Sequence, residues 1–244
     1  MRRSALLLLL ALVGCGGGDD PRLVVSAASS MTDALTACSR DFDGADVRLS
    51  FAGSDELAAQ IRQGVKPDVY AAANTKLPDE LNKEGLLSKP VEFATNELVI
   101  AVPRDSDVRE TADLRRQGMK LAIGSDSVPV GMYTRELLAR LPAGEGNLIL
   151  GNVRSNEPDV RGIVGKLTQG AADAGFVYVT DVNAAGDALE AIELPAELQP
   201  EVTYGAGVVE GAREPEEAQA FVDGLSDGPC AEALSEAGFG EAPG

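Results

Sequence analysis

The sequence lacks histidine and tryptophan entirely, and aromatic residues occupy only 4% of its 244 positions. Without histidine the chain cannot form a Ser-His-Asp or Cys-His catalytic site, and nearly every kind of zinc enzyme site is excluded. Carboxylate chemistry and Ser-Lys chemistry remain open, so the expectation of an enzyme is low rather than absent. Because aromatic side chains are scarce, the core has to be built from leucine, valine, isoleucine and alanine.

Positive charge is also scarce. The chain has 21 Lys and Arg against 39 Asp and Glu, a formal net charge of −18. This acidic balance favours solubility and argues against nucleic acid or an anionic membrane surface as a partner. It does not exclude a local anion site, because a few aimed N–H groups can bind an anion inside an acidic protein. The length suits one large domain or two small lobes.

The apolar run near the N-terminus, residues 5–13, is too short to span a membrane as a helix. It follows the basic residues Arg2 and Arg3, and residues 12–15 resemble a bacterial lipobox that ends at Cys15. We therefore expect residues 1–15 to be a lipoprotein signal peptide with Cys15 as the lipidated residue, followed by a flexible tether over 16–21. An ordinary cleaved signal with a chance cysteine is the alternative.

The two remaining cysteines, Cys38 and Cys230, are far apart in the sequence. In an exported protein an even pair of cysteines favours a disulfide, which would join the start of the mature chain to its end. Two buried free thiols are the alternative.

From residue 23 onward, strand patterns alternate with helical ones. Short apolar or alternating runs predict strands, and apolar residues at helical spacing predict helices between them. This alternation predicts an α/β fold with largely parallel sheets. The strands are expected at 23–26, 47–51, 69–73, 98–102, 121–124, 174–178 and 202–209, and the helices at 31–42, 57–61, 133–141, 160–167, 218–225 and 231–237.

Four segments place small or hydroxyl residues where a strand gives way to a helix. Free N–H groups and the helix dipole make such a position suitable for an anion, and strand ends at a switch point are where ligands bind in doubly wound folds. Any one serine at a helix start is more simply explained as a cap. The segments are Ala27-Ala28-Ser29-Ser30, Gly53-Ser54, Val128-Pro129-Val130-Gly131 and Pro158-Asp159-Val160.

These segments carry a resemblance to the periplasmic molybdate-binding proteins of ABC importers, a family of type II solute-binding proteins. The opening motif is residues 26–35, SAASSMTDAL, and the second is FAGS at 51–54 with its continuation to Asn74. Residues 128–133, VPVGMY, are similar to the family's V-P-A-G-x-Y. Asp159-Val160-Arg161 and Gly175-Phe176-Val177-Tyr178 complete the set in order.

The resemblance implies a two-lobed fold, each lobe a mostly parallel sheet flanked by helices, with 22–97 and 203–244 forming lobe 1 and 98–202 forming lobe 2. It also implies that both lobes bind an oxyanion. Ser30 and Ser54 would each contribute a hydroxyl and a backbone N–H, Val130 and Val160 backbone N–H groups, and Tyr178 its phenol. Val130 replaces the family's usual alanine and Gly53 a frequent serine, so pocket size can differ.

Such a site offers donors and no carboxylate, so it suits a fully deprotonated ion. Hydrogen phosphate carries an O–H that needs an acceptor and should bind poorly. Arg161, beside Val160, fits a surface or supporting role better than a direct contact with the ion.

The sequence therefore predicts an exported binding protein that captures molybdate or tungstate and delivers it to an ABC importer permease. It would be a monomer without a cofactor, held by lipid at the outer face of the cytoplasmic membrane or in the periplasm. Sulfate or another oxyanion is the alternative ligand, and ferric iron is disfavoured because the chain has only four tyrosines, of which Tyr178 alone is among the expected ligand residues. A ligand-free structural lipoprotein and a serine hydrolase are the remaining alternatives. No Ser-x-x-Lys or Gly-x-Ser-x-Gly motif supports the hydrolase.

Overall fold

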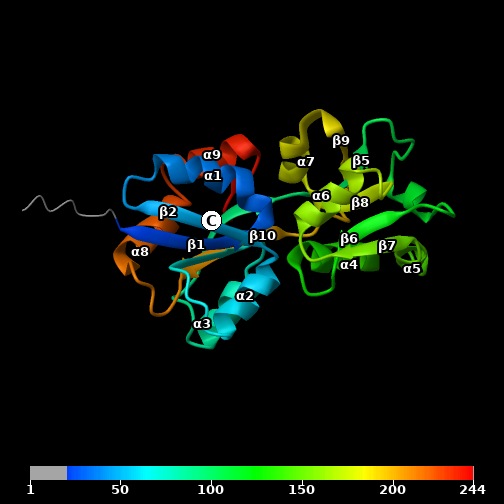
Figure 1. Ribbon diagram of the computed structural model, residues 1–244. Helices are drawn as coiled ribbons and strands as arrows, with labels where there is room; N and C mark the ends of the chain where they lie inside the picture. Colours follow the sequence, from blue (N-terminus) through cyan, green and yellow to red (C-terminus); the bar gives the residue numbers. More distant parts are fainter. Residues whose placement is uncertain (1–20, 244) are drawn as a thin grey trace, which may run out of the picture.

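The computed structural model describes residues 21–243, which form two bodies side by side, each a β-sheet covered by helices (Figure 1). We call the body around the first sheet the first lobe and the other the second lobe. The predicted signal peptide and the predicted lipidation site Cys15 lie outside the described residues. Within the described range, no helix is long and apolar enough to span a membrane.

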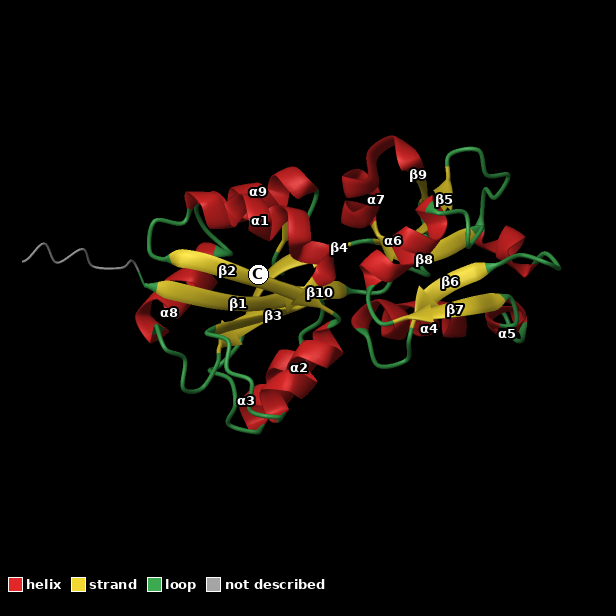
Figure 2. Cartoon of the chain, viewed as in Figure 1, coloured by secondary structure: helices red, strands yellow, loops and turns green. Residues whose placement is uncertain are grey.

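The first lobe contains a six-stranded sheet in the order β11-β4-β10-β3-β1-β2 (Figure 2). β1 pairs in parallel with both β2 and β3, and helical crossovers connect these strands. β10 lies antiparallel to β3 and β4, and β11 lies antiparallel to β4. The strands are β1 (Arg22–Ala28), β2 (Asp46–Ala52), β3 (Val69–Ala72), β4 (Val91–Asn96), β10 (Val202–Val208) and β11 (Gly240–Glu241).

Helices cover both faces of this sheet. α1, α8 and α9 pack on one face, whereas α2 and α3 lie on the other (Figure 1). The helices are α1 (Thr32–Asp41), preceded by the 3-10 turn η1 (Ser29–Met31), α2 (Ser54–Arg62), α3 (Lys76–Lys83), α8 (Pro215–Gly224) and α9 (Pro229–Ala237).

The second lobe repeats the plan with a five-stranded sheet in the order β7-β6-β8-β5-β9. β6 is parallel to β7 and β8, whereas β5 is antiparallel to β8 and β9. The strands are β5 (Leu98–Pro103), β6 (Leu121–Gly124), β7 (Val153–Glu157), β8 (Ala174–Tyr178) and β9 (Leu189–Ile192). The helices are α4 (Pro129–Arg140), α5 (Glu145–Leu150), α6 (Val160–Thr168) and α7 (Val179–Ala185), with 3-10 turns η2 (Thr111–Arg115) and η3 (Gly186–Ala188).

The two-lobed α/β fold is confirmed, but the sheets are mixed rather than mostly parallel. Parallel pairs occur where helices connect the strands, as between β1 and β2 or β6 and β7. Antiparallel pairs occur around β4, β5 and β10, the strands that flank the passages of the chain between the two sheets. A strand that enters a sheet from the other lobe needs no crossover helix, so its direction is not restricted to parallel.

The chain passes from one sheet to the other at Glu97 and returns before Val202, one residue ahead of the expected return at Thr203. Gln199 joins the two passages: its side-chain oxygen accepts from the Leu98 N–H at 3.1 Å, and its amide nitrogen donates to the Leu98 carbonyl at 3.1 Å. The two passages therefore form one connected hinge region.

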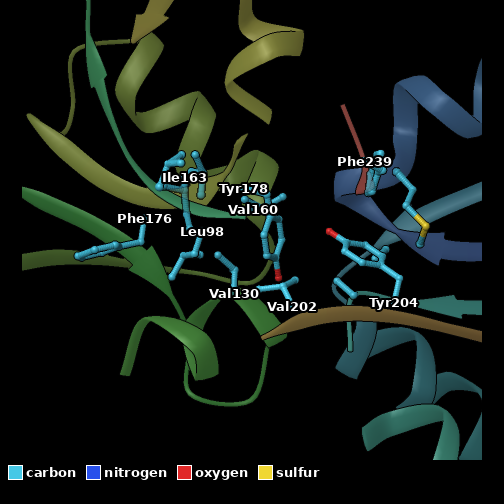
Figure 3. Packing of buried hydrophobic residues seen from close by; sticks show 14 of the residues in the cluster. Leu98, Val130, Val160, Ile163, Phe176, Tyr178, Val202, Tyr204 and Phe239 are labelled. Atoms are coloured by element: carbon cyan, nitrogen blue, oxygen red, sulfur yellow. The ribbon is translucent and has the colours of Figure 1, made fainter. Parts of the chain in front are cut away.

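Buried aliphatic and aromatic side chains fill each lobe. Leu98, Ile163 and Phe176 pack in the second lobe, while Tyr204 and Phe239 pack in the first (Figure 3). The structure joins Cys38 in α1 to Cys230 in α9 by a disulfide that spans 192 positions of sequence. This bond lies within the first lobe and ties its N-terminal part to its C-terminal part.

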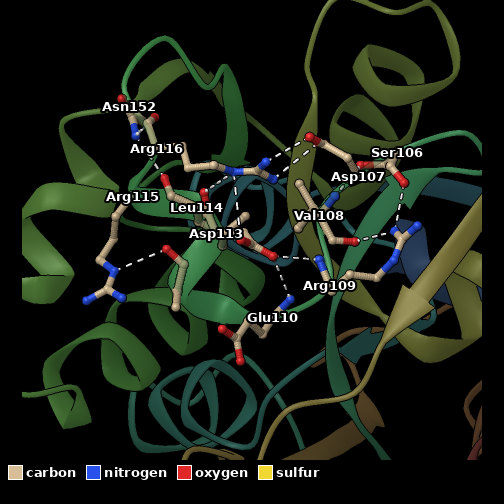
Figure 4. A network of polar contacts seen from close by, with 11 residues as sticks. Ser106, Asp107, Val108, Arg109, Glu110, Asp113, Leu114, Arg115, Arg116 and Asn152 are labelled. Atoms are coloured by element: carbon tan, nitrogen blue, oxygen red, sulfur yellow. Dashed lines mark hydrogen bonds and ion pairs between the residues drawn. The ribbon is translucent and has the colours of Figure 1, made fainter.

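A polar network holds the long connection between β5 and β6 (Figure 4). The Asn152 amide donates to the carbonyls of Leu114 and Arg116, at 2.8 and 3.0 Å, and Arg116 also pairs with Asp107 at 2.8 Å. Side chains thereby replace the regular backbone pairing that this connection lacks.

Candidate functional site

A small cavity lies between the two lobes. Its wall combines the ends of strands with the starts of helices from both sheets. The lining residues of the first lobe are Ala28, Ser29, Ser30, Ala52, Gly53, Ser54 and Ala73, and those of the second lobe are Val128, Pro129, Val130, Asp159, Val160 and Tyr178.

Ser54 is the first residue of α2 and is 1% exposed. Its hydroxyl oxygen accepts from the backbone N–H of Ala73 at 3.1 Å, and its carbonyl accepts from the Tyr70 hydroxyl at 2.7 Å. A hydroxyl has a single proton, so an oxygen that already accepts from an N–H keeps that proton for another partner. The Ser54 hydroxyl is therefore set up as a donor.

Ser30 lies in η1, the turn that leads from β1 into α1. Its hydroxyl lies 3.0 Å from the hydroxyl of Tyr204 on β10. Ser30 thus belongs both to the cavity wall and to a group of polar side chains behind it.

The second lobe presents backbone donors. Val160 is the first residue of α6, and Val130 follows Pro129 in the first turn of α4. The first N–H groups of an α-helix have no intrahelical acceptor, and the helix dipole adds positive potential at the same end. Three helices of nine or more residues, α2, α4 and α6, therefore begin at one cavity, and their dipoles favour an anion there.

Tyr178 ends β8 and is 1% exposed. Its hydroxyl oxygen is buried and has no hydrogen-bond partner among the described residues. Figure 3 shows this hydroxyl at the end of the ring that lies beside Val130. Burial raises the pKa of Tyr178 well above its ordinary value, so the phenol keeps its proton and can donate. A buried hydroxyl without a partner costs free energy, which a ligand that accepts its proton would recover.

Asp159 also lines the cavity, which modifies the expectation of a wall without carboxylates. Its side-chain oxygen accepts from the Gly162 N–H at 2.9 Å and caps the start of α6. Asp159 is the N-cap residue of α6, and its carboxylate stabilises the start of that helix.

Arg161 pairs with Asp33 of α1 at 3.6 Å, and both side chains are at least half exposed. Arg161 is not among the cavity-lining residues. The ion pair instead links α6 of the second lobe to α1 of the first, at the surface beside the cavity.

Gly53 allows the lobes to approach closely. A Cβ atom at this position would lie 2.4 Å from the carbonyl oxygen of Pro158 in the other lobe. The serine common at this position in the resembling family does not fit this arrangement, and the glycine lets the two walls of the cavity meet.

The structure brings the five predicted residues, Ser30, Ser54, Val130, Val160 and Tyr178, together around one cavity. Sequence reasoning missed Tyr204 and Asn96, which stand behind Ser30. Neither lies in a motif, and they come from strands 108 positions apart, so no local pattern identified them.

Comparison with known proteins identifies the family. The family model of bacterial extracellular solute-binding proteins matches residues 23–240. The chain belongs to this family. Among its relatives is the molybdate-binding protein ModA of Mycobacterium tuberculosis, which is 32% identical over 251 residues, covering 96% of this chain and 94% of the relative. The resemblance noted in the sequence is thereby confirmed.

Solved solute-binding proteins share the fold. The periplasmic molybdate-binding protein of Azotobacter vinelandii superposes with a TM-score of 0.79 at 21% identity, covering 89% of this chain and 98% of that one. The sulfate-binding protein SubI of Mycobacterium tuberculosis also gives a TM-score of 0.79, at 16% identity, covering 90% of this chain and 86% of that one. Because proteins named for different oxyanions match equally well, the fold alone does not select the ion.

Proposed function

We propose that this solute-binding protein captures molybdate, or tungstate, between its lobes and delivers it to an ABC importer. The observation that carries the proposal is the cavity wall itself. There the starts of α2, α4 and α6 meet the Tyr178 hydroxyl, which has no partner in the part of the chain that the structure describes. Relatives named as molybdate-binding proteins support the choice of ion. The protein acts by binding and release, without catalysis and without a cofactor.

Hydrogen bonding explains how such a wall selects its ligand. Hydroxyl and N–H groups donate to every oxygen of a dianion that carries no proton. Hydrogen phosphate brings an O–H, and a buried O–H without an acceptor costs about 1–3 kcal/mol. One carboxylate oxygen of Asp159 and the hydroxyl oxygen of Ser54 already accept from the N–H groups of Gly162 and Ala73. We therefore expect molybdate and tungstate to bind far more tightly than phosphate.

We further propose that the mature chain is a monomer anchored through lipidated Cys15. The basic start, short apolar run and lipobox-like residues 12–15 support the anchor. Tethering would keep the binding protein close to its importer while residues 16–21 allow it to reach the permease.

Thermal unfolding with separate ions tests the proposal. The chain from Gly16 onward is heated with molybdate, tungstate, sulfate or phosphate. A ligand at 1,000 times its Kd adds about 4 kcal/mol, which for this chain length raises Tm on the order of 10 °C. A rise with molybdate and tungstate but not phosphate is expected. A rise with sulfate alone would change the substrate, and no rise with any ion would refute oxyanion capture.

A matched pair of serine variants ties the response to the cavity. Ser30→Ala removes a wall hydroxyl and should weaken binding by about 1–3 kcal/mol. Ser226→Ala changes an exposed serine in the connection after α8, away from the cavity, and should leave the ion-induced rise intact.

A further inference from the structure

A chain of side-chain hydrogen bonds runs behind the cavity from the hinge region to Ser30. Asn96, the last residue of β4, donates through its amide nitrogen to the hydroxyls of Thr180 and Tyr204, at 2.9 and 3.3 Å. The Tyr204 hydroxyl in turn lies 3.0 Å from the Ser30 hydroxyl. Asn96, Thr180 and Tyr204 are all buried, so water does not compete for these bonds.

The direction of this chain is fixed at Asn96. The backbone N–H of Glu97 lies 2.9 Å from the side-chain oxygen of Asn96. An N–H can only donate, so the atom that faces it has to be the amide oxygen. The amide nitrogen is thereby directed to the other side, where its two hydrogens meet Thr180 and Tyr204.

The direction passes through Tyr204. Its oxygen accepts from Asn96, and its single proton is left for the Ser30 oxygen. Burial raises the pKa of Tyr204 well above its ordinary value, so the phenol retains that proton at any physiological pH. Ser30 accepts from Tyr204, and its own proton is then free to point into the cavity that it lines.

We propose that Asn96 and Tyr204 are positioning residues that hold Ser30 as a hydrogen-bond donor and so set the preference of the cavity for oxyanions without a proton. The inference rests on the proposed function. Ser54 reaches the same state through the backbone N–H of Ala73, whose polarity no side-chain substitution reverses. The direction of the Ser30 hydroxyl depends on two side chains, so substitutions of those side chains can change it.

Two variants change the direction in different ways. Asn96→Asp replaces the donor to Tyr204 with an acceptor, so Tyr204 turns its proton toward residue 96 and Ser30 donates to Tyr204. The Ser30 oxygen then faces the cavity as an acceptor, which suits the O–H of hydrogen phosphate. Tyr204→Phe removes the link and leaves the Ser30 hydroxyl free to donate or accept.

The experiment measures affinities of wild type and variants for molybdate, sulfate and phosphate by titration calorimetry at pH 8. All three ions are then mainly dianions, and only phosphate carries a proton. The charge that Asn96→Asp introduces repels all three, so the ratio of affinities isolates the hydrogen-bond direction. We expect the ratio of molybdate to phosphate affinity to fall about tenfold or more in both variants. The reason is that the hydrogen bond from Ser30 to the ion is reversed in direction or no longer held in place. The molybdate-to-sulfate ratio should stay constant, since neither ion carries a proton.

Thr180→Val is the matched control. It removes the other acceptor of the Asn96 amide and leaves the branch to Tyr204 and Ser30 in place, so both ratios should remain as in wild type. Far-ultraviolet circular dichroism and a thermal melt verify folding, and Tyr204→Phe alone decides the matter where Asn96→Asp does not fold. Wild-type binding with an unchanged molybdate-to-phosphate ratio in the folded variants would overturn the positioning role alone. A wild-type chain that binds none of the ions would overturn the proposed function and this inference with it.

Discussion

The two walls of the cavity offer different combinations of donors. The first-lobe wall combines the start of α2 with the hydroxyls of Ser30 and Ser54, whereas the second-lobe wall combines the starts of α4 and α6, at Val130 and Val160, with the Tyr178 phenol. A backbone N–H is a donor whatever side chain it carries, so valine serves as well as alanine in that role. A hydroxyl can donate or accept, so each serine needs a partner behind it that fixes its direction. The serine hydroxyls of the first wall therefore depend on supporting residues, whereas the helix-start donors depend on backbone geometry.

The largest expected effect on affinity comes from deleting a backbone donor. Val160→Pro removes the N–H at the first position of α6, where proline is well tolerated and the preceding Asp159 is already extended. Loss of a hydrogen bond to a charged ligand costs about 1.5–3 kcal/mol, or roughly ten- to hundredfold in affinity. Titration calorimetry with molybdate measures the loss. Val160→Ala retains the N–H and should retain most of the affinity; an equal loss in both variants would show that the side chain, and not the backbone donor, matters.

Tyr178→Phe should separate binding from stability. The variant loses a donor to the ion, so affinity should fall about tenfold, the equivalent of about 1.4 kcal/mol. It also removes a buried hydroxyl that has no partner among the described residues, so the ligand-free protein should gain about 1 kcal/mol. Titration calorimetry and the Tm of the ligand-free protein together test the two expected changes, a lower affinity and a higher stability. A fall in both quantities would mean that the hydroxyl has a protein partner in solution.

A pH-dependent change in stability is expected beside the second wall. Asp181 is buried, and burial raises its pKa to about 8, against the opposing effects of the Tyr178 N–H and Arg161; Asp33 and Asp159 add to the rise. An unfolded carboxyl releases its proton near pH 4, so the folded state binds the extra proton between about 4 and about 8. Stability therefore falls as pH rises through this window.

Asp181→Asn removes this titration. The variant should gain stability relative to wild type as pH rises from about 4 to about 8, and the difference should level off above the raised pKa. Wild-type affinity for molybdate should also decline above pH 8, because the carboxylate then forms next to Tyr178, while the variant stays flat. Chemical denaturation and calorimetry across pH 5–9 give both curves. Parallel stability curves for wild type and variant would show that the pKa of Asp181 is not raised in the folded protein.

The sequence predicted most of the strands and helices and missed β4, β7, β9, β11, α3, α5 and α7. All strands expected from apolar runs are present, but β7, with the sequence VRSNE, lies at a sheet edge and has no continuous apolar face. α3 was missed because Pro78 resembles a helix breaker. In the structure Pro78 is the third residue of α3, in the first turn, where its missing N–H is not needed.

The site shows the same division. The five wall residues lie in short motifs at the strand–helix joins, so the chain order reveals them. Asn96 and Tyr204 become neighbours only when β4 and β10 pair in the hinge region, so the sequence around either residue does not predict their contact. The mixed direction of the sheets escaped prediction for a related reason, because it depends on how the chain passes between lobes.

The disulfide between Cys38 and Cys230 gives the molecule the topology of a covalent ring with two short tails. The whole second lobe and most of the first lobe lie within that ring, between the two cysteines. A single backbone cut anywhere in the second lobe therefore opens the ring without dividing the molecule, and its two pieces part only after the bond is reduced. The first lobe, assembled from both ends of the chain, keeps its ends together through such damage.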